Sequence, residues 1–531
     1  MIGRTLETSI TCDNRVIQAL VVRIKSILLH NAVDLDIMGR RVRGYRTPDA
    51  PSIWIRDMSD MIRGFKYWEN DVTSAVTHFA DTQSARGWLF DYFTMTPEKV
   101  PCERENWLKQ VRVPVEADVE YRFVKAVHEA WQACGDDAWL EAVAPNMERA
   151  LAYIMNDELR WDDGSGLVKR AYTIDTWDFD YTAGAHPWLN FQMGPGTYWG
   201  LMHGDLSGYY EAFRLLAKMQ RHLGHAGRGD YWEETADSFR KRANRIAFNG
   251  RFYTHHVPIV PVVIPGVNEA KQLSLSNPMA INRGLADAQM AQAIISEYRA
   301  RAAATGAFAE WWGIDPPMPD GIFGDEKIVA GAYCNGGIMP LVGAELARAA
   351  FEQGHEEYGV QQLERYEKLT RDETSYLWYF PDGRPPTIDT STSPDASPTD
   401  GWGSAAMLYA IVEGLAGVRD TDRLFRALQL SPRWPAAGVR EAELRLTYPA
   451  SGASLGYRYR AADDGTVTLE LEGSAKIDLH LLLTRGRRAT KLMLDGAPVE
   501  KREVMVGESR YVDASFDLQG SATLTVATVA S

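Results

Sequence analysis

The sequence lacks the features of a membrane protein and of a nucleic-acid-binding protein. The 531 residues contain no apolar run of about 20 residues, which a transmembrane helix needs. The first twenty residues lack the basic start and apolar stretch of a signal peptide. The net charge is −14 and no block of Lys and Arg occurs, so neither nucleic acid nor membrane is an expected partner.

Cysteine is scarce, and its positions predict neither disulfides nor a metal site. The four cysteines are Cys12, Cys102, Cys134 and Cys334. They show no Cys-x-x-Cys spacing, which fits free thiols in a reducing cytoplasm. The histidines also lack the spacing of metal ligands. We therefore predict a cytoplasmic protein with no metal and no other cofactor.

Helical patterns in pairs fill the chain up to about residue 430. Phe123, Val127 and Trp131 share one helical face, the segment "CGDD" interrupts the pattern, and Leu140 and Met147 begin a second apolar stripe. This pattern predicts two antiparallel helices. It recurs along the chain, so that we expect about a dozen helices in all. Because the pairs vary in spacing and long aromatic loops separate them, we favour an (α/α)6 toroid barrel over a solenoid of strict repeats.

The pattern changes to period two near residue 440. Segments such as "TVTLELEG" alternate apolar and polar residues, and Gly and "DDG" turns separate them. This alternation predicts antiparallel strands that form a small β-sandwich. The fold class is therefore mainly α, with a barrel over residues 1–435 and a C-terminal β-sandwich over residues 436–531.

One loop collects carboxylates beside aromatic residues. The segment "TIDTWDFDYTAG", residues 173–184, has no helical or strand periodicity and contains Asp175, Asp178 and Asp180 close to Trp177. A purely structural loop would more simply use Gly, Pro, Ser and Asn. Aromatic neighbours remove water from a carboxyl group and raise its pKa, as a general acid requires. The loop is therefore the first candidate for a catalytic site.

Four segments resemble motifs of glycoside hydrolases built on an (α/α)6 barrel. "WDFDYT" resembles the trehalase segment whose aspartate is the general acid. "IWIRDMSD" (53–60) resembles an aromatic-x-Arg-Asp loop of glucoamylases, trehalases and processing α-glucosidases. "YCNGGIMP" (333–340) and "TDGWGSAAML" (399–408) resemble their Asn-Gly-Gly turn and the segment before their last barrel helix. A β-sandwich after the barrel recurs among related rhamnosidases. The resemblance implies an inverting, exo-acting glycosidase.

Inversion requires two carboxyl groups about 6.5–9.5 Å apart, one acid and one base. We predict Asp178 as the acid, with Asp175 as the alternative. No glutamate matches the base of the similar families, so the loop "TSTSPDASPTDGWG" becomes its expected source. We predict Asp400 as the base because it directly precedes a packed helix, and Asp395 stays open. Both aspartates could instead cap that helix.

Further residues of the four motifs are expected to bind the sugar. Arg56 and Asp57 would hold hydroxyl groups, and Trp54 would offer a stacking face. The alternative for the first two is an ion pair that joins neighbouring loops. The remaining predicted binding residues are Asp175, Trp177, Trp312, Asn335 and Trp402. Glu116 and Asp118 precede a helix, and a cap or macrodipole role explains them adequately.

Three other functions remain open. "TSTS" (390–393) is compatible with a glycoside phosphorylase, in which phosphate replaces the activated water. Tyr172, Tyr181 and His186 are compatible with a polysaccharide lyase or a sugar epimerase. A non-catalytic carbohydrate-binding protein would explain the aromatic loops but not three aspartates in one loop. The expected partner is a carbohydrate substrate whose identity the sequence does not give, and a homo-oligomer is compatible with the sequence.

Overall fold

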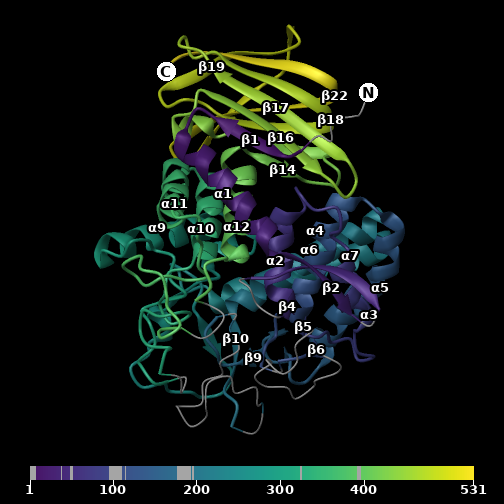
Figure 1. The fold of residues 1–531 in the computed structure, drawn as a ribbon, viewed down its shortest axis with the longest axis vertical. Coiled ribbons are helices and arrows are strands. Elements are labelled where there is room, and N and C mark those ends of the chain that lie inside the picture. The colour runs from purple at the N-terminus through teal and green to yellow at the C-terminus, as the bar shows by residue number, and fades with distance from the viewer. Residues whose placement is uncertain are drawn as a thin grey trace.

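The computed structural model describes residues 7–37, 39–47, 52–94, 110–113, 115–175, 177, 193, 196–322, 326–391 and 396–531. A helical body carries a large sheet at one end, and short strands and loops lie at the other end (Figure 1). The helices are α1 (Arg15–Asn31), α2 (Ile55–Phe65), α3 (Ser74–Asp81), α4 (Val119–Cys134), α5 (Asp137–Asn156), α6 (His203–His222), α7 (Ala226–Ala247), α8 (Asn277–Asn282), α9 (Ala288–Thr305), α10 (Pro340–Glu352), α11 (Glu356–Leu369) and α12 (Gly401–Tyr409).

The predicted helix pair at residues 119–156 is confirmed. Gly135 ends α4 in the left-handed conformation at φ 65°, which a glycine adopts without strain. Asp136 then caps α5, because its side chain accepts a hydrogen bond from the backbone amide of Trp139 at 2.9 Å. The "CGDD" interruption therefore supplies both the end of one helix and the start of the next.

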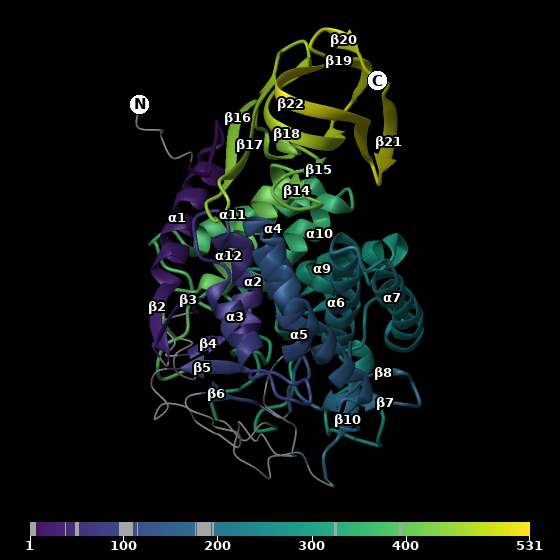
Figure 2. The same ribbon diagram turned by 90° about the vertical axis from the view of Figure 1, so that its right-hand side faces the viewer.

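Six helices contact one another in a closed order. Helix α2 packs against α4, α4 against α6, α6 against α8, α8 against α10, α10 against α12, and α12 against α2. Nearly every residue of α2, α4 and α10 is buried, whereas α5 buries a residue only every third or fourth position. Helices buried all round lie inside a fold, and one-sided helices cover it. The paired helices lie around these six in Figures 1 and 2.

The sheet at the far end has ten strands, in the main order β1-β16-β17-β18-β22-β19-β20; β15 pairs with β18, β14 pairs with β15, and β21 pairs with β22. Its strands are β1 (Ser9–Cys12), β14 (Val418–Asp420), β15 (Ala427–Leu430), β16 (Glu441–Tyr448), β17 (Ala453–Ala461), β18 (Val467–Leu482), β19 (Arg487–Leu494), β20 (Ala497–Pro498), β21 (Arg502–Val506) and β22 (Ser509–Ala530). The long strands β18 and β22 pair antiparallel from Val467↔Val526 to Leu482↔Tyr511. The sheet curves strongly (Figure 2), and the predicted antiparallel strands are confirmed.

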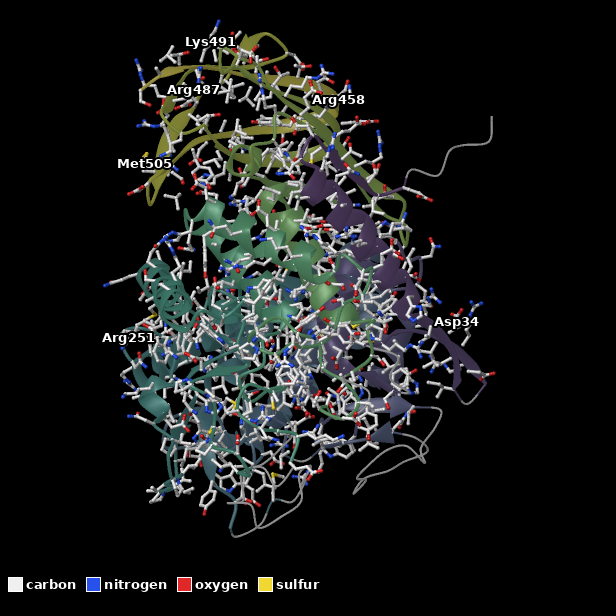
Figure 3. All side chains as sticks on the ribbon, turned by 60° about the vertical axis from the view of Figure 1, so that its left-hand side comes forward. Asp34, Arg251, Arg458, Arg487, Lys491 and Met505 are labelled. Carbon is white, nitrogen blue, oxygen red and sulfur yellow. The ribbon has the colours of Figure 1, made fainter. Side chains whose placement is uncertain are left out.

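The sheet also recruits strands from outside the predicted β region. Strand β1 pairs antiparallel with β16, with Ser9 opposite Arg445. Strand β15 pairs in parallel with β18. On the exposed face, Arg458 of β17 forms ion pairs of 3.1 Å with Glu443 and Glu470 on the two adjacent strands (Figure 3). The boundary at residue 435 stays a prediction, since strands from both sides of it build this sheet.

The short strands gather at the end of the helical body away from the sheet (Figure 1). They are β2 (Ala32–Ile37), β3 (Arg40–Tyr45), β4 (Ser52–Trp54), β5 (Tyr92–Thr94), β6 (Gln110–Val111), β7 (Trp161–Asp162), β8 (Leu167–Val168), β9 (Arg170–Ala171), β10 (Trp199–Met202), β11 (His256–Pro258), β12 (Leu273–Ser274) and β13 (Ile314–Asp315). Within the described residues, every helix is too short or too polar to cross a membrane.

Candidate active site

The predicted sugar-binding motif "IWIRD" lies where β4 passes into α2, at the end of the body away from the sheet (Figure 1). Trp54 is partly exposed, and its ring lies 3.9 Å from the ring of Tyr92 on the neighbouring strand β5. The first turn of α2 carries Arg56 and Asp57. The structure therefore brings these two residues and Trp54 together at one end of the helical body.

Arg56 is held by two buried carboxylates. Its Nε donates to Asp118 Oδ2 at 2.8 Å, and its Nη2 donates to Asp118 Oδ1 at 3.0 Å and to Glu116. Asp118 occupies the N-cap position of α4, but its side chain makes no capping hydrogen bond. Asp118 therefore does not cap α4 with its side chain, because Asp118 and Glu116 bind the Arg56 guanidinium instead; the macrodipole role stays a prediction. The side chain of Arg56 keeps 10% of its surface exposed, so it also borders the site.

Asp91 adds a further carboxyl group behind Arg56. It is fully buried, and neither of its oxygens has a hydrogen-bond donor among the described residues. Burial and the neighbouring Glu116 raise the pKa of Asp91 well above its usual value. Loss of water and a neighbouring carboxyl group both favour the neutral form of Asp91. The sequence carries no local signal for this pair, since 25 residues separate its members.

Asp57 has the properties of a group that can exchange a proton near neutral pH. Its side chain is partly exposed, and among the described residues it forms no ion pair or hydrogen bond with another side chain. Burial raises the pKa of Asp57 to about 7, although the Arg56 and Arg122 charges oppose the shift. A carboxyl group of this kind, free and close to solvent, can bind hydroxyl groups or take part in proton transfer.

Asp60 lies one turn after Asp57 and is surrounded by donors. Its Oδ1 accepts from Lys125 Nζ at 2.8 Å, and its Oδ2 accepts from Arg122 Nη1 at 2.6 Å. The indole Nε1 of Trp402 donates to the same Oδ2 at 2.9 Å. Burial would raise the pKa of Asp60, but Lys125, Arg122 and Arg63 hold it well below its usual value. Asp60 is not among the site residues predicted from the sequence, although its spacing of three residues from Asp57 places both on one face of a helix.

Three aromatic rings lie together next to Asp60, because one of them belongs to Trp402. The Trp402 ring centroid is 6.2 Å from that of Trp177, which is 5.4 Å from that of Tyr333. Two of the three, Trp177 and Trp402, were predicted to bind the sugar. Tyr333 was missed; it has a positive φ of 48°, which is unusual for a bulky residue. Backbone strain of this kind is often found at functional sites.

Asp400 forms the N-cap of α12. Its Oδ1 accepts from the Trp402 amide at 3.0 Å and from Thr47 Oγ1 at 2.9 Å, and its Oδ2 accepts from the Gly403 amide at 3.0 Å. The side chain has no exposed surface, and burial raises its pKa to about 6. These are the contacts of the helix cap that the sequence offered as the alternative. The role of Asp400 as the base stays a prediction.

Asp175 is fully buried, and its contacts hold the start of the aspartate-rich segment, residues 173–175. Its Oδ2 accepts from Ser274 Oγ at 3.0 Å and from the Ser276 amide at 3.1 Å, while Oδ1 has no donor among the described residues. His203 Nε2 lies 3.6 Å from Oδ2, and burial lowers the pKa of His203. Asp175 therefore joins the loop to the segment 274–276 rather than facing solvent.

Two other predicted binding residues are also buried. Asn335 holds together the loop around it, because its Oδ1 accepts from the Met318 amide at 2.7 Å and its Nδ2 donates to the Met318 carbonyl at 3.0 Å. Trp312 is 4% exposed and stacks on Tyr298. Their contacts explain how the loops are held, and direct contact with a sugar stays a prediction for both.

Several predicted residues lie outside the described residues. These are Asp178, the predicted acid, and Asp395, the alternative base, together with Asp180, Tyr181 and His186. Trp177, the residue before Asp178, is described and lies in the aromatic cluster. In the described part of the chain, no group of three or more His, Cys, Asp and Glu residues is arranged to hold a metal ion.

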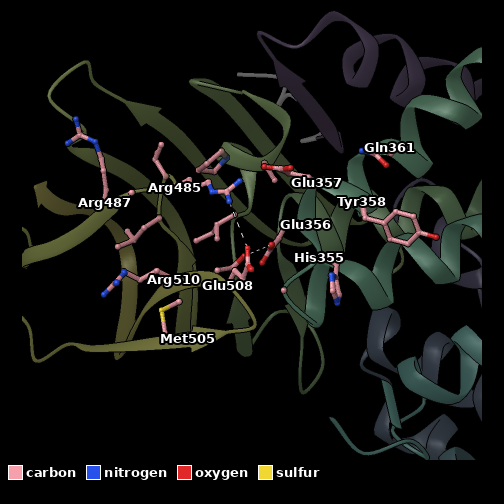
Figure 4. Close-up of a pocket in the computed structure, with 18 of the residues that line it drawn as sticks. His355, Glu356, Glu357, Tyr358, Gln361, Arg485, Arg487, Met505, Glu508 and Arg510 are labelled. Atoms are coloured by element: carbon pink, nitrogen blue, oxygen red, sulfur yellow. Dashed lines mark hydrogen bonds and ion pairs between the residues drawn. The ribbon is translucent and has the colours of Figure 1, made fainter. Parts of the chain in front are cut away.

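A separate cleft of about 640 Å³ lies between the helical body and the sheet (Figure 4). Some of its charged side chains pair with one another: Arg365 Nη1 donates to Glu310, and Arg485 Nη2 lies 3.9 Å from Glu508. None of the described residues that were predicted for the sugar site lines this cleft. The cleft therefore belongs to the joint between the two parts of the molecule.

Comparison with known sequences matches the chain to no protein family and to no curated protein. Solved structures do resemble it. The α-L-rhamnosidase of Dictyoglumus thermophilum aligns with a TM-score of 0.63 and 12% identity over 98% of this chain and 50% of its own. The α-L-rhamnosidase of Streptomyces avermitilis, in complex with L-rhamnose, aligns with a TM-score of 0.59 and 14% identity over 98% of this chain and 42% of its own.

The GH63 mannosylglycerate hydrolase of Thermus thermophilus gives a TM-score of 0.53 and 13% identity over 74% of this chain and 99% of its own. The chain spans about half the length of the rhamnosidases that it matches. The more specific resemblance to trehalases, glucoamylases and processing α-glucosidases stays a prediction. At these identities the likeness concerns the fold alone, and the chain shares its fold with these two α-L-rhamnosidases and with the mannosylglycerate hydrolase.

Proposed function

We propose that the chain is an exo-acting glycoside hydrolase on an (α/α)6 toroid, which removes a terminal sugar with inversion. The observation that carries the proposal is Asp57, a partly exposed carboxyl group with a pKa near 7 that follows the carboxylate-bound Arg56. Trp54 and the cluster of Trp177, Tyr333 and Trp402 supply aromatic surface on the same part of the body. Free carboxyl groups beside aromatic rings suit a ligand with hydroxyl groups and apolar ring faces.

The toroid is supported by the closed order of contacts from α2 through α12 and back to α2. The loops at one end of such a ring surround a central pocket, which suits attack on the end of a sugar chain. Solved structures of similar fold bear the names of enzymes that hydrolyse glycosides, which supports this reaction class. The identity of the sugar is left to experiment.

For the acid we propose Asp178, since Trp177 before it belongs to the aromatic cluster. The acid would protonate the leaving oxygen, while a second carboxylate would activate a water on the opposite face of the ring. For the base, the burial of Asp400 and its three accepted hydrogen bonds favour Asp395 of the same loop. Asp57 would accept hydroxyl groups of the terminal sugar in its ionised form.

A panel of disaccharides and aryl glycosides, rhamnosides included, tests the reaction class in phosphate-free buffer. Release of free sugar supports hydrolysis. Turnover that requires added phosphate would indicate a phosphorylase, and an unsaturated product that absorbs ultraviolet light would indicate a lyase. Binding without turnover of any compound would contradict an enzymatic role.

A further inference from the structure

The indole N–H of Trp402 has one acceptor among the described residues, the Asp60 carboxylate. Trp402 is 3% exposed and lies in the first turn of α12. A buried indole N–H without an acceptor destabilises the folded state, so this hydrogen bond selects the orientation of the ring. Because α2 carries Asp60 and α12 carries Trp402, the bond also joins two neighbouring helices of the closed ring.

Three cationic side chains also hold the Asp60 carboxylate in place. Lys125 and Arg122 of α4 donate to its two oxygens, and Arg63 Nη2 lies 3.4 Å from Oδ1. Cations around a buried carboxylate keep it charged, and a charged acceptor makes a stronger hydrogen bond to the indole than a neutral one. The carboxylate has little freedom to turn, because Lys125, Arg122 and Trp402 all donate to it.

Trp402 in turn packs against Trp177, at 6.2 Å between ring centroids, and Trp177 contacts Tyr333. A rotation of the Trp402 ring would therefore disturb Trp177, the residue directly before the proposed acid. We infer that Asp60 is a positioning residue of the reaction: its carboxylate fixes the Trp402 indole, and through that ring the Trp177 side chain. This inference rests on the proposed function.

The kinetic test compares D60N, W402F and the double variant. A displacement of about 1 Å in an active site costs on the order of 100-fold in rate. We expect each single variant to lower kcat by about 10- to 100-fold, with KM changed by less than about threefold. Since both act through one hydrogen bond, the double variant should be no worse than the poorer single variant. If D60N fails to fold, W402F still tests the inference, because it leaves the ion pairs of Asp60 in place.

The matched control is W434F. Trp434 is also fully buried, and its Nε1 donates to Tyr457 Oη at 2.8 Å, beside the C-terminal sheet. W434F removes the same kind of hydrogen bond, so it should lower stability similarly while kcat stays within about threefold of the wild type. A rise in KM alone in W402F, unchanged kcat in both single variants, or an equal loss in W434F would overturn the inference.

A second measurement needs no activity. In protein labelled with nitrogen-15 at tryptophan, D60N should shift the indole resonance that W402F removes and leave the resonance that W434F removes in place. If the wild type hydrolyses no glycoside but this shift occurs, the proposed function fails while the hydrogen bond is upheld. If the wild type is active and the Trp402 resonance does not move in D60N, the positioning role is refuted.

Discussion

Asp57 and Asp60 lie one helical turn apart on α2, and their surroundings give the two carboxyl groups opposite properties. Asp57 is paired with no described cation and has its pKa raised to about 7 by burial, whereas Lys125, Arg122 and Arg63 hold the pKa of Asp60 low. Pairs of titratable groups whose pKa values are driven apart often mark a division of roles. Here Asp60 is suited to hold its neighbours in place, and Asp57 is suited to meet a ligand.

The raised pKa of Asp57 predicts a cost in stability that depends on pH. An aspartate has a pKa of about 3.9 when unfolded, so between about pH 4 and pH 7 the folded state binds more protons than the unfolded state. The contribution of Asp57 to stability therefore falls as pH rises through this window. D57N should raise the free energy of unfolding by on the order of 2 kcal/mol at pH 8 and by much less at pH 5.

Urea unfolding at the two pH values measures this difference. The control is D34N, since Asp34 is exposed and its pKa is lowered by the hydrogen bond from Arg41. D34N should not become more stable at pH 8. An equal gain for D57N at both pH values, or a loss at pH 8, would refute the pKa assignment. Whatever the unfolding result, turnover by D57N should fall, because the carboxylate that accepts the sugar hydroxyl groups is lost.

The role of Asp178 predicts a dependence on the leaving group. An acid is needed when the leaving oxygen is a poor leaving group, as in a disaccharide, and is scarcely needed for an activated aryl glycoside. D178N should therefore lose hydrolysis of a disaccharide by about 100-fold or more and lose far less with the aryl substrate. Steady-state kinetics on both substrates measure this. Equal losses on both would show that Asp178 is not the acid.

At the scale of the elements, helix ends position the site. The first turn of α2 carries Arg56 and Asp57. Asp118, which binds Arg56, is the N-cap residue of α4, and Asp400 is the N-cap residue of α12. Asp400 Oδ1 also accepts from Thr47, a residue more than 350 positions earlier in the chain. The start of α12, and with it Trp402, is thus tied to the segment before β4.

The cap predicts different outcomes for two replacements of Asp400. D400A removes an acceptor of three buried hydrogen bonds and should cost about 2 kcal/mol or more of stability. D400N keeps an acceptor oxygen and should retain most of the stability and, if the residue is only a cap, most of the turnover. D395A should leave stability unchanged and abolish hydrolysis. Thermal unfolding and kinetics of the three variants decide between them.

Loss of turnover in D400N at normal stability would restore Asp400 as the base. In that case added azide should rescue D400A and give a product of inverted configuration, because azide can occupy the site of the attacking water. If D395A and D400N both stay active, neither aspartate is the base, and the inverting reaction loses its support in this loop.

Which elements could be predicted from the sequence depends on whether the signal was local. The α4–α5 pair could be predicted because Gly135 and Asp136 carry both helix ends within two residues. The strands after residue 440 could be predicted because alternation follows the face of a sheet. The binding of Arg56 by Asp118 could not, since a residue before a helix looks like a cap whether its side chain turns inward or not.

For the molecule as a whole, the two ends of the chain meet in one sheet. Strand β1 lies on the outer side of β16, and Ile10 in it is 3% exposed. Thr8 and Thr447 exchange two hydrogen bonds beside this strand, at 3.1 and 2.8 Å. This pairing could not be predicted from the sequence, because the four residues of β1 are too few to show a period.

Removal of residues 1–12 should therefore destabilise the whole molecule. It would uncover the edge of β16, and an unpaired edge strand favours association with other chains. We expect a lower melting temperature and larger species in size-exclusion chromatography. Replacement of the exposed Ser9 by Ala is the control and should change neither property. An unchanged melting temperature after the truncation would contradict this role of β1.

The central claim is that the chain hydrolyses a terminal sugar with inversion, and proton NMR of the newly formed product tests it most directly. The first sugar released from a substrate of known anomeric configuration should carry the opposite configuration before mutarotation, and D178N should release none from a disaccharide. A product of the same configuration would contradict inversion. If no glycoside in a broad panel is cleaved, the proposed function itself is contradicted.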